Sequence, residues 1–216
     1  VIGYFASDAE VKSAPAQSGA GVGRFRYADM NGDGKIDPND RTYLGSPVPT
    51  YTGGVNVGLT YKDFDLNMYL YASAGNKIWN QSKWFTDFYG TFEGSGKGER
   101  AKKSWTPALG NAAEAPIWES ASNISTSAAE NSWYVEDGDY IRLQNISLGY
   151  KLPKNVISKI GVKSAKLTLS ANNLFTLTKY KGLDPGVGGA ADTSFGIDVG
   201  NYPVTRSFNA SINLNF

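Results

Sequence analysis

The acidic stretch of residues 29–40, "DMNGDGKIDPND", holds the side chains of this chain best suited to bind a metal ion. Calcium loops of twelve residues take oxygen ligands from positions 1, 3, 5, 7, 9 and 12 and turn sharply at a glycine in position 6. Gly34 stands at that sixth position. The spacing predicts a Ca²⁺ site whose ligands are the side chains of Asp29, Asn31, Asp33, Asp37 and Asp40 and the main-chain carbonyl of Lys35.

This loop has little room for the second helix of a calcium sensor, because Pro47 and Pro49 follow within ten residues. Asp40 at position 12 is shorter than the usual Glu, which favours monodentate and weaker binding. We therefore expect a structural ion, held with the affinity of extracellular modules, on the order of 10⁻⁴–10⁻³ M. A polar turn built from Asn, Asp, Gly and Pro is the alternative interpretation.

The overall composition excludes several kinds of chemistry. The chain of 216 residues contains no Cys and no His, so it has no disulfide framework, no triad base and no common transition-metal ligand. Its net charge is +1, which gives no electrostatic case for binding nucleic acid. Because the sequence opens on "VIGYFASDAE", with no initiator Met and no signal peptide, we expect a mature or internal piece rather than a whole precursor.

All five tryptophans lie in the connection 75–138. Aromatic rings present flat apolar faces that pack a loop onto itself, anchor a partner or stack on a ligand. Packing and contact are both open interpretations here. The residues proposed for ligand or partner contact are Trp79, Trp84, Phe85, Tyr89, Trp105, Trp118 and Trp133.

Five segments alternate between apolar and polar residues with a period of two, which is typical of strands with two unlike faces. No apolar stretch approaches the eighteen residues of a membrane helix, whereas strands of about ten residues can cross a bilayer when tilted. The first half of the third segment is less regular than the rest. The predicted strands are residues 53–61, 64–74, 139–152, 165–177 and 205–216.

The connections between these strands are unequal. Strands 53–61 and 64–74 are joined by about two residues, whereas the loops 75–138 and 178–204 are long. Short turns on one side and long loops on the other are typical of outer-membrane barrels. We therefore predict an all-β fold, an antiparallel transmembrane β-barrel segment over 51–216, with an extracellular loop region over 1–50 and a periplasmic C-terminus.

The positions of aromatic residues and the number of strands both extend this prediction. Tyr51, Tyr61, Phe64 and Tyr150 lie near predicted strand ends, where membrane barrels place aromatic girdles. Five strands cannot close a barrel, so either "VGRFRYA" in 1–50 supplies a further strand or the chain is the C-terminal piece of a larger barrel. We prefer the larger barrel.

Five stretches in order resemble the C-terminal region of SusC/RagA-type TonB-dependent outer-membrane transporters. They are "RFRYADMNGDGKIDPNDRTYLGSPVPTYTGGVNVGLTYKDFDLNMYL", "SWTPALGNAAEAP", "YIRLQNISLGYKLP", "AKLTLSANNLFTLTKYKGLDP" and the terminal "FNASINLNF". One departure is "LDPGV" at 183–187, where the family often has Glu after Asp-Pro. The terminal strand also resembles the signal read by the barrel-assembly machinery, with Phe208, Ala210, Ile212, Leu214 and Phe216 as its residues.

The resemblance implies a 22-stranded barrel with an N-terminal plug that lies outside this chain, in the outer membrane of a Gram-negative, Bacteroidota-type cell. It implies contact with TonB through the absent N-terminal region, a SusD-like surface lipoprotein as partner, and import of oligosaccharides or peptides. Outer-membrane lipid would surround the strands.

Other functions fit the sequence less well. Asp87, Glu93 and Glu99 could form a glycosidase pair, but they sit in an unpatterned loop, so no enzyme is expected. The alternative reading is a secreted, calcium-stabilised β-sandwich that binds carbohydrate or docks like a dockerin. Dockerins carry two calcium loops, and this sequence has one, which favours the transporter.

Overall fold

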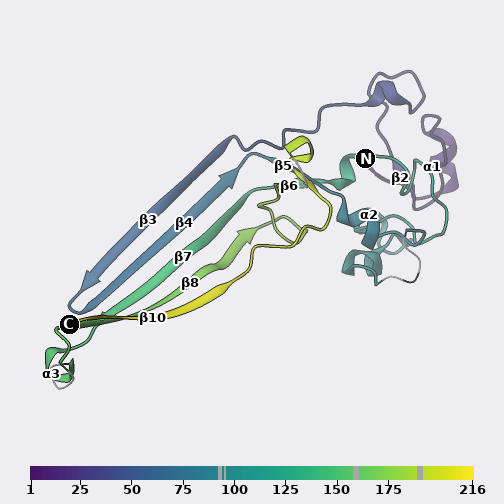
Figure 1. The fold of residues 1–216 in the computed structure, drawn as a ribbon. Coiled ribbons are helices and arrows are strands. Elements are labelled where there is room, and N and C mark those ends of the chain that lie inside the picture. Colours follow the sequence, from purple (N-terminus) through teal and green to yellow (C-terminus); the bar gives the residue numbers. More distant parts are fainter. Residues whose placement is uncertain (92–93, 95, 158–160, 189–191) are drawn as a thin grey trace. The chain divides into compact units, whose positions relative to one another are not determined.

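The computed structural model describes residues 1–91, 94, 96–157, 161–188 and 192–216 (Figure 1). These residues divide into two compact units. The first unit comprises Val1–Gly45, Trp79–Glu136 and Gly188–Gly200, and the second comprises Ser46–Ile78, Asp137–Val187 and Asn201–Phe216.

The second unit is built on one antiparallel sheet of five strands, in the order β10-β8-β7-β4-β3 (Figure 1). Each strand lies on one of the five alternating segments of the sequence, and the mostly β fold is confirmed. Among the described residues, no helix is long and apolar enough to span a membrane. The strands are β3 (Tyr51–Tyr61), β4 (Phe64–Ala74), β7 (Tyr140–Lys151), β8 (Ser164–Thr178) and β10 (Ser207–Asn215).

Short connections close one end of this sheet, which we call the turn end. Lys62, with a positive φ of 53°, and Asp63 join β3 to β4 in a two-residue turn. The helix α3 (Lys154–Ile157) lies in the connection from β7 to β8. There Ile157 packs with Val162 and Ala165 in a small apolar cluster. The long connections leave from the opposite end, which we call the loop end.

The irregular first half of β7 has a structural cause. Against β4, the pairing shifts register between Leu143 and Asn145, so Gln144 is an extra residue that disrupts the alternation of β7. Against β8, Leu143 and Asn145 pair with Phe175 and Asn172, so the extra residue lies on β8. On β8 the same irregularity includes Asn173, which has a positive φ of 51°. Beyond the bulge the apolar side chains still share one face of the sheet, because Leu143 pairs with Leu70 on β4 and with Phe175 on β8.

The first unit contains little regular structure. Its helices and turns are α1 (Asp8–Ser13), α2 (Ser82–Thr86), η1 (Pro38–Asp40), η2 (Glu99–Lys103), η3 (Gly110–Ala112), η4 (Ser132–Tyr134) and η6 (Asp192–Ser194). Its strands are β1 (Gly3–Tyr4) and β2 (Phe25–Arg26), which pair with each other, and β9 (Ile197–Asp198). A small sheet has the order β6-β5-β9, with β5 at Lys77–Asn80 and β6 at Val135–Asp137.

The candidate strand "VGRFRYA" contributes only β2, and β2 pairs with β1 rather than with the five-stranded sheet. The first unit is therefore held by side chains and loop hydrogen bonds more than by strands. Gln17 shows this, because its side-chain amide donates to the Phe25 carbonyl and to the Ser125 hydroxyl, each at 2.7 Å.

Aromatic rings form the core of the first unit. Phe25 is fully buried, and its ring centroid lies 5.8 Å from Tyr4, 6.3 Å from Phe88 and 5.5 Å from Trp133. Burial raises the pKa of Tyr4, because the phenolate would lose its hydration. The long connections that the sequence left unpatterned thus have a packed core of their own.

We expect Phe25→Ala to destabilise the first unit by about 3–5 kcal/mol, because it removes a ring that contacts at least three others. Thermal unfolding of the purified protein followed by tryptophan fluorescence measures this effect. Tyr43→Ala is the matched control, since Tyr43 is 79% exposed. Equal melting temperatures for the two variants would contradict the packing described here.

Candidate functional site

The five-stranded sheet has one continuous apolar face. Residues directly opposite each other in an antiparallel pair share a face, so the register assigns every row. The apolar rows are Tyr61–Phe64–Tyr150–Leu167–Ile212, Leu59–Leu66–Leu148–Leu169–Ala210 and Val57–Met68–Ile146–Ala171–Phe208. Many of these side chains are exposed, among them Leu59 at 58%, Leu169 at 52% and Ile212 at 58%. Apolar area of this extent marks an interaction surface.

The opposite face is polar and mostly uncharged. Asn56, Tyr69, Asn145, Asn172 and Ser207 form one row across all five strands. The Asn145 amide donates to Asn172 at 2.8 Å, and the Asn172 amide donates to Ser207 at 3.0 Å. The two faces therefore suit two unlike environments.

Aromatic rings lie at the turn end of the apolar face, as the girdle prediction requires of Tyr61, Phe64 and Tyr150. These three residues stand in one row, and the rings of Phe64 and Tyr150 stack at 4.6 Å. Tyr51 lies at the loop end and is 75% exposed.

The acidic loop is folded by hydrogen bonds to its own carboxylates. The Asp29 carboxylate accepts from the main-chain N–H groups of Gly32 at 2.7 Å and Gly34 at 2.8 Å. The Asp40 carboxylate accepts from Met30 at 2.7 Å and from Asp37 at 2.8 Å. Hydrogen bonds from the backbone of Asp37 and Met30 lower the pKa of Asp40, since they favour its charged form.

The remaining predicted ligands take part in the same turns. Asp33 accepts from the Lys35 N–H at 2.9 Å, and Asn31 accepts from the Asp33 N–H at 3.0 Å. Asp37 caps the turn η1 in a capping box with Asp40. In the part of the chain that the structure describes, no three acidic side chains converge as a metal site. Calcium binding by this loop stays a prediction.

The aromatic residues of the connection 75–138 separate into two groups. Trp105 is buried, and Trp79, Trp84 and Trp133 pack against the same core. Trp105 is only 6% exposed, so packing is the role that its position favours, and its contact role stays a prediction. Phe85 packs edge-on against Trp84 with centroids 5.1 Å apart.

Tyr89 and Trp118 form the exposed group. They are 43% and 42% exposed, and their rings meet edge-on with centroids 5.5 Å apart. Of the seven rings predicted to contact a ligand or partner, these two present the most accessible pair. Their contact role stays a prediction.

The carboxylates considered for catalysis are engaged elsewhere or lie outside the description. Asp87 is buried and pairs with Arg100 at 2.5 Å, and Glu99 pairs with Lys102 at 2.7 Å. Glu93 lies outside the described residues. A second buried pair joins Lys83 to Glu136 at 2.7 Å. Desolvation lowers the pKa of Lys83, and Glu136 opposes this effect.

No family model matches the chain. Among curated proteins, it is 36% identical to TonB-dependent receptor P3 of Formosa agariphila over 88% of its length, and 30% identical to TonB-dependent receptor P26 of the same organism over 100%. It is 26% identical to TonB-dependent receptor SusC of Bacteroides thetaiotaomicron over 88%. Among solved structures, the RagAB peptide importer in its closed-closed state matches 81% of the chain with a TM-score of 0.63 and 26% identity. The chain is related to the SusC/RagA type of TonB-dependent receptor. The resemblance predicted from the sequence motifs is confirmed.

The chain spans only about a fifth of the curated TonB-dependent receptors that it matches, between 17% and 22% of their length. It covers 18% of the RagAB chain in the closed-closed structure. The match therefore concerns one region of these long proteins.

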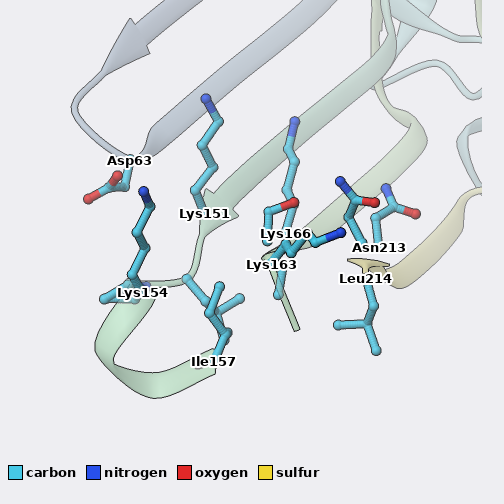
Figure 2. Close-up of a pocket in the computed structure, with 13 residues that line it drawn as sticks. Asp63, Lys151, Lys154, Ile157, Lys163, Lys166, Asn213 and Leu214 are labelled. Atoms are coloured by element: carbon cyan, nitrogen blue, oxygen red, sulfur yellow. The ribbon is translucent and has the colours of Figure 1, made fainter. Parts of the chain in front are cut away.

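The sequence analysis missed a basic cavity at the turn end of this receptor segment (Figure 2). The cavity has a volume of about 460 Å³ and is lined by Lys151, Lys154, Lys163 and Lys166. Lys166 pairs with Asp65 at 2.9 Å, and the Lys163 ammonium donates to the Phe216 carbonyl at 3.1 Å. The sequence does contain a signal for this basic cavity, because the stretch "KLPKNVISKIGVKSAK" repeats lysine without any acidic residue.

We expect the acidic loop to bind Ca²⁺ with a dissociation constant on the order of 10⁻⁴–10⁻³ M, and Asp29→Asn to weaken it. Isothermal titration of the purified protein with calcium chloride measures this affinity. Asp63→Asn is the matched control, because it removes a carboxylate outside the loop. A titration with no heat above background at millimolar calcium would reduce the loop to a polar turn.

Proposed function

We propose that the chain is part of the wall of a TonB-dependent outer-membrane importer, with its apolar face toward lipid and its polar face toward the lumen. The exposed apolar face carries this proposal. Water would solvate such a face poorly, whereas lipid would cover it. The relatives named TonB-dependent receptors support the same function.

The two free edges of the sheet support a larger barrel. Among the described residues, the outer edges of β3 and β10 have no strand partner. Unpaired main-chain groups are costly in a bilayer, so these edges would pair with further strands of the full-length protein. A barrel of 22 strands would provide them.

The connectivity supports an orientation. The short turns and Phe216 share the turn end, which we place in the periplasm, and the long connections leave from the loop end, which we place outside the cell. The first unit, with the acidic loop, belongs to those connections. Calcium would hold this loop in shape as a structural ion.

Partners and cargo follow by analogy with the relatives. RagAB is named a peptide importer, which supports peptides as cargo. Oligosaccharides, and capture with a SusD-like lipoprotein, follow from the family resemblance. Tyr89 and Trp118 are the rings that we assign to ligand or lipoprotein contact. TonB would act on a region outside this chain. The barrel-assembly machinery would read the terminal strand, in which Phe208 and Phe216 are each 72% exposed.

The soluble β-sandwich is the competing function, and the exposed face argues against it. A sandwich buries the apolar face of each sheet against a second sheet. Here Val55, Leu169 and Ile212 stay exposed within the second unit.

Paired arginine substitutions in the middle of β3 test the lipid-facing assignment. Val55 lies on the apolar face and its neighbour Asn56 on the polar face. Val55→Arg should cost about 2–4 kcal/mol and lower the amount of assembled barrel, since it places a charge in lipid near the midplane. Asn56→Arg should assemble normally. The measurement is heat-modifiable migration of outer-membrane fractions in gels, and equal assembly of the two variants would contradict the proposal.

A further inference from the structure

The connection that follows β8 turns back over the polar face of the sheet. Arg142 pairs in register with Tyr71 on β4 and Thr176 on β8, which puts it on the polar face near the loop end. Asp184, from the connection, reaches this arginine with its carboxylate 2.5 Å from Nη2. Arg142 is 5% exposed and Asp184 is 9% exposed, so residues of the connection cover this part of the face.

We call this ion pair the Arg142–Asp184 clamp. The Arg142 Nε donates to the Thr176 hydroxyl at 2.9 Å, and its guanidinium carbon lies 5.0 Å from the ring centroid of Tyr140. The Asp184 carboxylate also accepts from the main-chain N–H groups of Gly186 at 2.8 Å and Val204 at 3.0 Å. One carboxylate therefore links Arg142 on β7 to both the beginning of the connection, at Gly186, and its end, at Val204.

Electrostatics favour a stable ion pair between Arg142 and Asp184. Burial acts to raise the pKa of Asp184, but hydrogen bonds from Val204 and Gly186, together with Arg142, outweigh burial and leave the pKa lowered. The carboxylate is thus charged at neutral pH. Removing one partner of a buried pair strands the other charge, which is far more costly than losing an exposed pair.

Close packing fixes the segment further. Tyr180 is 6% exposed, and a Cβ on Gly182 would lie 2.3 Å from its hydroxyl oxygen. A Cβ on Gly186 would lie 3.1 Å from the Asp184 carboxylate. Because glycine has no Cβ, the backbone at Gly182 can approach the Tyr180 hydroxyl, and the backbone at Gly186 can approach the Asp184 carboxylate. Leu183, in contrast, is 62% exposed.

We propose that residues 180–187 fold into the mouth of the barrel and narrow the transport path, with Arg142 and Asp184 as the positioning residues that hold them there. The inference rests on the proposed function, because the polar face lines a lumen only if the apolar face meets lipid. The segment then limits the size of the cargo that can pass. The Arg142–Asp184 clamp sets this limit, because it holds the segment in the path.

Thiol labelling in intact cells tests this placement, because these 216 residues contain no cysteine. Any cysteine in the rest of the full-length protein is first replaced by serine, so that each introduced thiol is labelled alone. Leu183→Cys should react with N-ethylmaleimide as fast as the exposed Tyr43→Cys does. With a bulky polyethylene-glycol maleimide it should react about tenfold more slowly than Tyr43→Cys, since the reagent cannot enter the mouth. Adding Asp184→Asn should recover about tenfold of that rate by freeing the segment.

A lipid-facing thiol separates the failure of this inference from the failure of the proposed function. Val55→Cys should resist both reagents in a membrane barrel, and rapid labelling there would overturn the proposed function itself. If Val55→Cys is protected while Leu183→Cys reacts equally with small and bulky reagents, the barrel stands and the inward segment is wrong. Should Asp184→Asn fail to assemble, the size dependence at Leu183→Cys alone decides the question.

Discussion

The structure depends on one constraint, the register of five antiparallel strands with a side-chain period of two. A slip of one residue in any strand would move its apolar side chains to the polar face and its Asn and Ser side chains to the apolar face. The bulge at Gln144 is where this constraint is most visible. Two irregular positions, Gln144 on β7 and Asn173 on β8, lie beside each other and compensate, so Leu143, Leu70 and Phe175 still share a face.

The strands could be predicted from the sequence because their signal is local. Alternation over about ten residues fixes both the strand and the face that each residue takes, so β3, β4 and β10 follow directly from "GVNVGLTY", "FDLNMYLYA" and "FNASINLNF". The sharp turn predicted at Gly34 in the acidic loop is also a local signal. In the structure Gly34 has the positive φ, 81°, that such a turn requires.

The first unit could not be predicted, because its contacts join residues far apart in the chain. Gln17 binds Ser125, and the Val1 amino group donates to Ser132 at 2.7 Å. No periodicity marks such pairs. The same reason hid the Arg142–Asp184 clamp, whose partners are 42 residues apart. The stretch "LDPGV" lacks the Glu that the family often has after Asp-Pro, and the carboxylate that forms the clamp is that of Asp184 itself.

Charge on the polar face of the sheet is concentrated at its two ends. The ion pairs stand at the two ends, Asp65–Lys166 at the turn end and Arg142–Asp184 at the loop end. Between them the rows of the polar face carry amides and hydroxyls, and in one row Asn145, Asn172 and Ser207 are joined by hydrogen bonds. A fixed charge in this middle zone would bind an opposite charge and slow its release. In the importer that we propose, amides and hydroxyls would hold sugars and peptide groups weakly enough to let them move, so the placement of charge supports the proposed transport path.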